Sequence, residues 1–152
     1  MIGLGESIVV DASVAVKLFV QDEHTPAARQ LFALTEHPVV YRAYVPAFFY
    51  SECANALWKS VRFADYSVKR AEEQIEDLGD LMLHVSPWHE WLGASFSIAV
   101  KYGITAYDAS YVALADNLDA TLLTCDTKLI NSLKNAPFDI QHLSKFSFPP
   151  AA

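Results

Sequence analysis

SIVVD, residues 7–11, is the segment that decides the fold. Its apolar residues Ile8, Val9 and Val10 are consecutive, which indicates a short strand buried on both faces rather than one face of a helix. The run ends directly in Asp11, where an ionised carboxylate without partners would be costly to bury. The segment therefore predicts a first strand of an α/β sheet with an acidic side chain at its carboxyl end.

The remaining sequence alternates short β-like runs with longer helical stretches, which favours an α/β domain with a parallel sheet. Ser13 is expected to cap a helix over about residues 14–20, and Thr25-Pro26 predicts the start of the next helix. Thr105 and Asp108 resemble a capping box. Four further strands are expected at Val39–Val45, Leu83–Val85, Thr121–Thr124 and Phe138–His142. One domain over residues 1–146 and an irregular tail over 147–152 follow from this pattern.

Composition places the chain among globular proteins. With 152 residues and 53% hydrophobic content, the chain can bury a core and is not mainly disordered. Its apolar runs are shorter than the roughly 18–20 residues of a membrane span, and the N-terminus lacks signal-peptide features, so we expect a cytosolic protein. Cys53 and Cys125 lie among apolar residues, which favours free thiols over a disulfide.

The net charge of −7 argues against a nucleic-acid partner, because phosphate binding usually requires a basic surface. The objection weakens if several of the acids converge on divalent cations, which would cancel part of the charge locally.

Four acids stand in unusual sequence contexts. Asp126 ends the strand-like segment TLLTC as Asp11 ends SIVVD, so both are expected at the crevice beyond the carboxyl ends of parallel strands. Glu52 has apolar helical neighbours at positions i−4, i−3, i+1 and i+4, and Asp108 falls in the first turn of a helix. Asp11, Asp108 and Asp126 could each serve only as helix caps, but their convergence with Glu52 at one sheet edge is harder to explain by capping.

Clustered carboxylates repel one another unless protons or cations neutralise them. Oxygen ligands favour hard ions such as Mg²⁺ or Mn²⁺, which activate water and stabilise charge on a phosphodiester. The pattern therefore indicates phosphoryl-transfer chemistry without naming the substrate.

Four ordered segments resemble PIN-domain proteins and, among them, the VapC-type toxins of toxin–antitoxin pairs. They are Val9–Ser13, Ser51–Trp58, Thr105–Ala115 and Leu122–Asp126. The resemblance implies a doubly wound fold with a central parallel sheet of about four to five strands. It also implies Mg²⁺- or Mn²⁺-dependent endonucleolytic cleavage of RNA, a homodimer and a small VapB-type antitoxin partner.

The family's acidic positions correspond to Asp11, Glu52, Asp108 and Asp126, which the resemblance makes catalytic and metal-binding. It favours the three aspartates as direct metal ligands. Glu52 would bind a second metal ion or position the attacking water. Polar neighbours expected to support these acids are Ser13, Asn55 and Thr124, although Asn55 could equally bond locally.

Other interpretations stay open at this stage. Lys17 and Lys59 are the foremost of several basic residues that could contact phosphate, and Tyr107 and Tyr111 could stack on bases, but solvated chains and core packing are the simpler explanations. A non-catalytic binding module is one alternative function. A receiver-like phosphoacceptor domain is another, weakened because Lys128 follows Asp126 too closely.

Overall fold

The computed structural model describes residues 5–37 and 40–149, and all structural statements concern these residues. The strands are β1 (Glu6–Val10), β2 (Tyr41–Pro46), β3 (Leu83–Ser86), β4 (Thr121–Thr124) and β5 (Ile140–His142). The α-helices are α1 (Ala12–Val16), α2 (Thr25–Thr35), α3 (Phe49–Phe63), α4 (Val68–Gly79), α5 (Leu92–Tyr102), α6 (Ala106–Asn117) and α7 (Thr127–Ser132). Short 3₁₀ turns are η1 (Trp88–Trp91) and η2 (Leu143–Lys145).

The strands form one parallel sheet in the order β3-β2-β1-β4-β5. The chain builds outward from β1 to β3 in one direction, then returns past β1 and continues through β4 to β5 in the other. This reversal places a topological switch point between β1 and β4, where open α/β sheets bind ligands beyond the carboxyl ends of their strands. The prediction of an α/β domain with a parallel sheet is confirmed.

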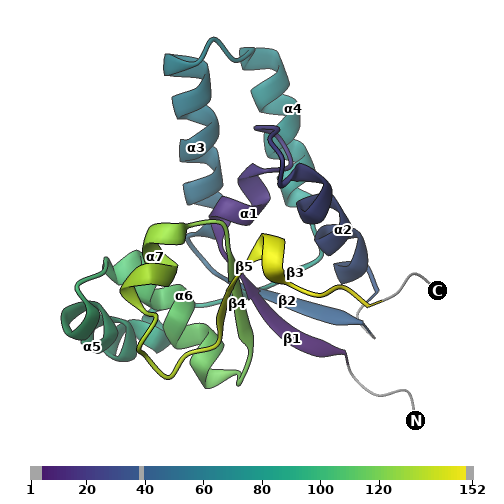
Figure 1. Cartoon of the computed structure of the whole chain (residues 1–152). Helices are drawn as coiled ribbons and strands as arrows, with labels where there is room; N and C mark the ends of the chain where they lie inside the picture. The colour runs from purple at the N-terminus through teal and green to yellow at the C-terminus, as the bar shows by residue number, and fades with distance from the viewer. Residues whose placement is uncertain (1–4, 38–39, 150–152) are drawn as a thin grey trace.

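Helices cover both faces of the sheet. Figure 1 shows α1 to α4 gathered on one side and α5 to α7 on the other, with α3 and α4 projecting as a helical hairpin. Helix α6 packs against β1, β2 and β4. Strand β4 is buried along its whole length and β1 from Ile8 to Val10, and Val9, Leu122 and Leu123 have no exposed surface. Burial on both faces explains why β1 is continuously apolar rather than alternating.

Some expected details are wrong. Ser13 does not cap a helix, because α1 already begins at Ala12 and Asp11 holds the N-cap position. The predicted strand start at Val39 and the end of the predicted tail, residues 150–152, lie outside the described residues.

The end of the described chain packs on the domain. Phe146 and Phe148 contact each other at 5.4 Å between ring centroids, and both lie against the core. Within the described ranges, no helix is long and apolar enough to cross a membrane.

Gly103 connects α5 to α6 and thereby positions Asp108. Its φ of 67° lies in the left-handed region, where a side chain strains the backbone. We expect Gly103→Ala to lower the free energy of unfolding by about 1 kcal/mol, measured by urea denaturation. Gly79→Ala is the matched control, since Gly79 ends α4 with open space around it and should tolerate alanine. Equal stability of both variants would contradict this.

Candidate active site

One cavity of about 300 Å³ brings together all four predicted acids: Asp11, Glu52, Asp108 and Asp126 line its wall. Ser13, Asn55 and Lys59 line it as well. The cavity lies at the carboxyl ends of β1 and β4, since Asp11 directly follows β1 and Asp126 lies two residues beyond β4. These acids, far apart in the sequence, therefore meet at the switch point of the sheet.

Each acid is positioned by the start of a helix. Asp11 and Asp126 occupy the N-cap positions of α1 and α7. Glu52 and Asp108 lie in the first turns of α3 and α6. Helix N-termini carry partial positive charge, which reduces the repulsion among carboxylates placed there.

Asp11 is the most deeply placed of the four acids, with 6% of its surface exposed. Its Oδ2 atom accepts two hydrogen bonds of 2.7 Å, one from the Ser13 hydroxyl and one from the Thr124 hydroxyl. Ser13 Oγ also accepts from the backbone N–H of Cys125 at 2.9 Å, and Thr124 Oγ1 accepts from the N–H of Asp126 at 3.0 Å. Two hydroxyls thus fix the Asp11 carboxylate and join the ends of β1 and β4.

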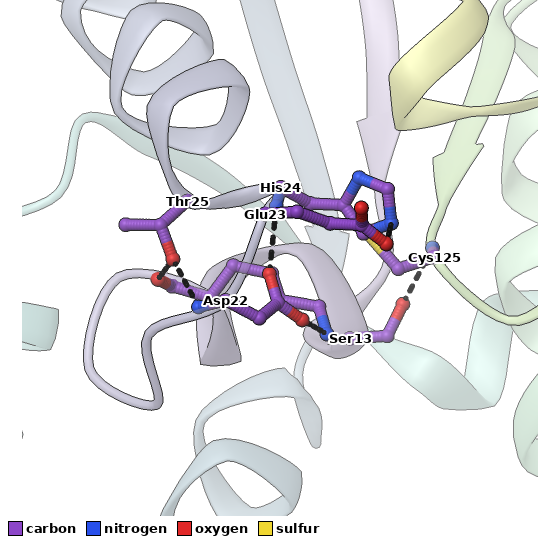
Figure 2. A network of polar contacts seen from close by, with 7 residues as sticks. Ser13, Asp22, Glu23, His24, Thr25 and Cys125 are labelled. Carbon is purple, nitrogen blue, oxygen red and sulfur yellow. Dashed lines mark hydrogen bonds and ion pairs between the residues drawn. The ribbon is translucent and has the colours of Figure 1, made fainter.

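The loop between α1 and α2 is held beside this junction, as Figure 2 shows for residues 22–25 near the bond from Cys125 to Ser13. Asp22 accepts a hydrogen bond of 2.8 Å from the His24 N–H and forms an ion pair with Lys17. The Lys17 ammonium lowers the pKa of Asp22. Lys17 is therefore engaged within this loop, whereas Lys59 lies on the acidic cavity.

Glu52 has a partner that the sequence analysis missed. The Tyr111 hydroxyl donates a hydrogen bond of 2.7 Å to Glu52 Oε1, and the Tyr111 side chain is fully buried. Tyr111 stands three residues after Asp108 on α6, so both face the same side of that helix. This three-residue spacing from Asp108 is the feature of the sequence that could have indicated a place for Tyr111 beside the acids. A buried hydroxyl bonded to the acid contradicts base stacking by Tyr111.

Burial and mutual repulsion raise the pKa values of three acids. Burial raises the pKa of Asp11 despite the bonds from Ser13 and Thr124, and the charge of Asp126 adds to the effect. For Glu52 and Asp108, burial is again the main cause, and the charge of Asp11 raises both pKa values further. The cavity therefore favours protons or cations over a free set of negative charges.

Helix capping accounts for part of this arrangement. Asp126 Oδ1 accepts hydrogen bonds from the N–H groups of Lys128 and Leu129 at 3.0 and 3.1 Å, so it does cap α7. The Thr105 hydroxyl accepts from the N–H of Asp108 at 3.1 Å, which is one half of the expected capping box. The Asp11 side chain makes no capping bond. Capping therefore leaves the burial of Asp11 unexplained.

The cavity suits a hard divalent cation, because its four acidic side chains all offer carboxylate oxygens as ligands. In the described part of the chain, no three histidine, cysteine, aspartate or glutamate side chains form a ready-made chelating group. Mg²⁺ does not need such a group, since it is commonly held by one or two carboxylates and keeps several waters.

The two cysteines lie near the site without entering the cavity. Both are free thiols, Cys53 buried and Cys125 half-buried. Burial raises the pKa of Cys53 to about 12 and that of Cys125 to about 11. Neither thiol is therefore activated as a nucleophile at neutral pH.

Comparison with known proteins places the chain in a family. The family model described as "PIN domain" matches residues 8–134. The chain is 35% identical over 126 residues to Ribonuclease VapC3 of Pyrobaculum aerophilum, covering 80% of this chain and 91% of that protein.

Two solved structures show the same architecture. PAE2754 from Pyrobaculum aerophilum superposes with a TM-score of 0.66 and 26% identity, covering 92% of this chain and 85% of the other. VapBC-1 from nontypeable Haemophilus influenzae gives a TM-score of 0.60 and 17% identity over 91% and 99% of the two chains, which shows the fold alone. The matched region includes all four acids that line the cavity, and the chain belongs to the PIN-domain family.

Proposed function

We propose that this protein is a metal-dependent endoribonuclease and the toxin of a toxin–antitoxin pair. The observation that carries the proposal is the convergence of four acids on one cavity at the switch point, with Asp11 buried among them. The name of the 35% identical relative, Ribonuclease VapC3, supports RNA as the substrate. The family resemblance supports the toxin role.

The residues divide the work as follows in this proposal. Asp11, Asp108 and Asp126 hold Mg²⁺ or Mn²⁺, while Glu52 holds a second ion or orients the attacking water. Such ions supply an activated water and charge stabilisation for in-line displacement at a phosphodiester. Ser13 and Thr124 fix Asp11 through their bonds to Oδ2, and Tyr111 fixes Glu52. Asn55 lines the same cavity.

The negative net charge of the chain opposes RNA binding. A net charge of −7 repels phosphate, and Lys59 is the basic residue on the wall of the acidic cavity. Cations bound by the acids would therefore serve to admit RNA as well as to cleave it. A cytosolic location remains part of the proposal, because both cysteines are free thiols.

Cleavage of a circular, internally labelled RNA pool tests the function. We expect cutting with Mg²⁺ or Mn²⁺, none with EDTA and none by Asp11→Asn, because the amide cannot supply the charged ligand. Asp116→Asn, an exposed position on α6 outside the cavity, is the matched control and should cut normally. Circular RNA has no ends, so its cleavage also distinguishes an endonuclease from an exonuclease. Full activity of Asp11→Asn would contradict the proposal, and RNA binding without cutting would favour the non-catalytic binding module.

The raised pKa of Asp11 predicts a pH-dependent stability without metal. Because its folded-state pKa lies above the unfolded value, its contribution to stability is present at low pH and is lost as pH rises through the folded-state pKa. In EDTA, we expect the melting temperature of the wild type to fall relative to Asp11→Asn as pH rises above about 4, the ordinary pKa of an aspartate carboxyl. Mg²⁺ should reverse that fall in the wild type alone. A wild-type-minus-variant difference independent of pH would contradict the prediction.

Two apolar surfaces support the proposed partners. Leu92, Phe96 and Val100 form an exposed stripe at four-residue spacing along α5, with Phe96 66% exposed, which suits a second copy of the chain. Phe63 and Trp58 lie together at the projecting end of the α3–α4 hairpin, with Phe63 74% exposed. We assign this second surface to a small antitoxin, on the far side of the molecule from α5 (Figure 1).

Two charge-introducing variants separate these surfaces. Phe96→Glu should convert a dimer into a folded monomer, and Phe63→Glu should remain dimeric, as measured by light scattering after gel filtration. With a co-expressed antitoxin from the adjacent reading frame, Phe63→Glu should lose the complex and Phe96→Glu should keep it. The reverse pattern would show that the two surfaces are wrongly assigned.

A further inference from the structure

A second cavity lies beside the acidic one and is larger, at about 680 Å³. Helix α7, strand β5 and turn η2 form its walls, and His24 at the start of α2 closes one side. None of the four acids borders it. The cavity is therefore separate from the site described above.

The two cavities adjoin at the turn between β4 and α7. Asp126 lines the acidic cavity, and the next residue, Thr127, lines the second one. Consecutive Cα atoms lie only about 3.8 Å apart, so both cavities open from the same turn. A single strand bound across this turn could place a phosphodiester at the acids and a neighbouring nucleotide in the second cavity.

The lining of the second cavity combines apolar and polar side chains. Ile130 and Ile140 provide aliphatic surface, and the amides of Asn131 and Gln141 provide donors and acceptors. Lys145 adds a positive charge. Aliphatic surface together with amide groups matches a nucleobase, whose faces pack and whose edges form hydrogen bonds.

Two histidines of the cavity lining pack against each other. The rings of His24 and His142 pack edge to face, with centroids 5.0 Å apart. His142 Nδ1 accepts a hydrogen bond of 3.1 Å from the N–H of Ser144, which holds the ring in place. Burial lowers the pKa of His142, and the charges of His24 and Lys145 act in the same direction. A neutral, fixed imidazole in the cavity lining suits stacking of bases, as in other single-stranded RNA sites.

We propose that this second cavity binds a base of the RNA strand adjacent to the phosphodiester at the acidic cavity, with Asn131 and Gln141 contacting the base edge and Lys145 the backbone. The proposal rests on the proposed ribonuclease function. It adds a specificity site: the nucleotide held here would set which phosphodiesters are presented to the acids.

Binding without chemistry tests this site independently of cleavage. The probe is a fluorescein-labelled, random-sequence single-stranded RNA with Ca²⁺ in place of Mg²⁺, so that a divalent cation still offsets the charge of the acids, and binding is followed by fluorescence anisotropy. We expect the double variant Asn131→Ala/Lys145→Ala to bind about tenfold more weakly than the wild type. The matched control, Asn135→Ala/Lys134→Ala, removes the same side-chain types outside the cavity lining and should stay within about twofold of the wild type. All four side chains are exposed, so neither variant should disturb folding.

The cleavage pattern gives a second readout. Sequencing of cut ends should show a nucleotide preference at one position beside the cut, and the cavity variant should relax that preference while the control keeps it. Equal RNA affinity of the two double variants, or no RNA binding by the wild type, would overturn the proposal. Normal RNA binding with loss of the antitoxin complex would overturn it in favour of a protein-docking cavity. Undiminished cutting by Asp11→Asn would contradict the ribonuclease function alone, so the two failures are distinguishable.

Discussion

The hydrogen bonds from Ser13 and Thr124 to one oxygen of Asp11 are the interaction on which the site depends. They satisfy a carboxylate that is almost fully buried, and burial of an unpartnered charge would be costly. The same hydroxyls accept backbone N–H groups at the end of β4, so they also fix the distance between two strands. Charge stabilisation and fold geometry are therefore coupled in one small network.

Strand order explains why acids so distant in sequence meet. Later strands are added on the other side of β1, which opens a crevice between the carboxyl ends of the parallel strands β1 and β4. Asp11 and Asp126 follow those strands. Helices α3 and α6 bring Glu52 and Asp108 to the same cavity from other parts of the chain. Burial is the main cause of the raised pKa values of Asp11, Glu52 and Asp108, and repulsion between the converging acids raises them further; a bound cation would offset both effects.

The sequence predicted the structure correctly where neighbouring residues alone determine it. An apolar run that ends in aspartate predicted both β1 and the place of Asp11, and strand TLLT appears as expected at Thr121–Thr124. It was uninformative where a contact depends on packing or on loop geometry. The bond from Tyr111 to Glu52 joins distant segments, and the ion pair of Lys17 with Asp22 depends on the shape of the loop between α1 and α2. Ser13 was expected as a cap because serine often caps helices, but the Asp11 carboxylate and the Cys125 N–H compete for its hydroxyl.

Calorimetric titration with Mn²⁺ tests the central claim most directly, because it measures the cation at the acids without requiring the correct RNA. The account predicts saturable binding by the wild type and by Asp116→Asn, and loss of that binding in Asp11→Asn with the fold intact by circular dichroism. Undiminished Mn²⁺ binding by a folded Asp11→Asn variant would contradict the claim that the buried carboxylate is the centre of a metal site.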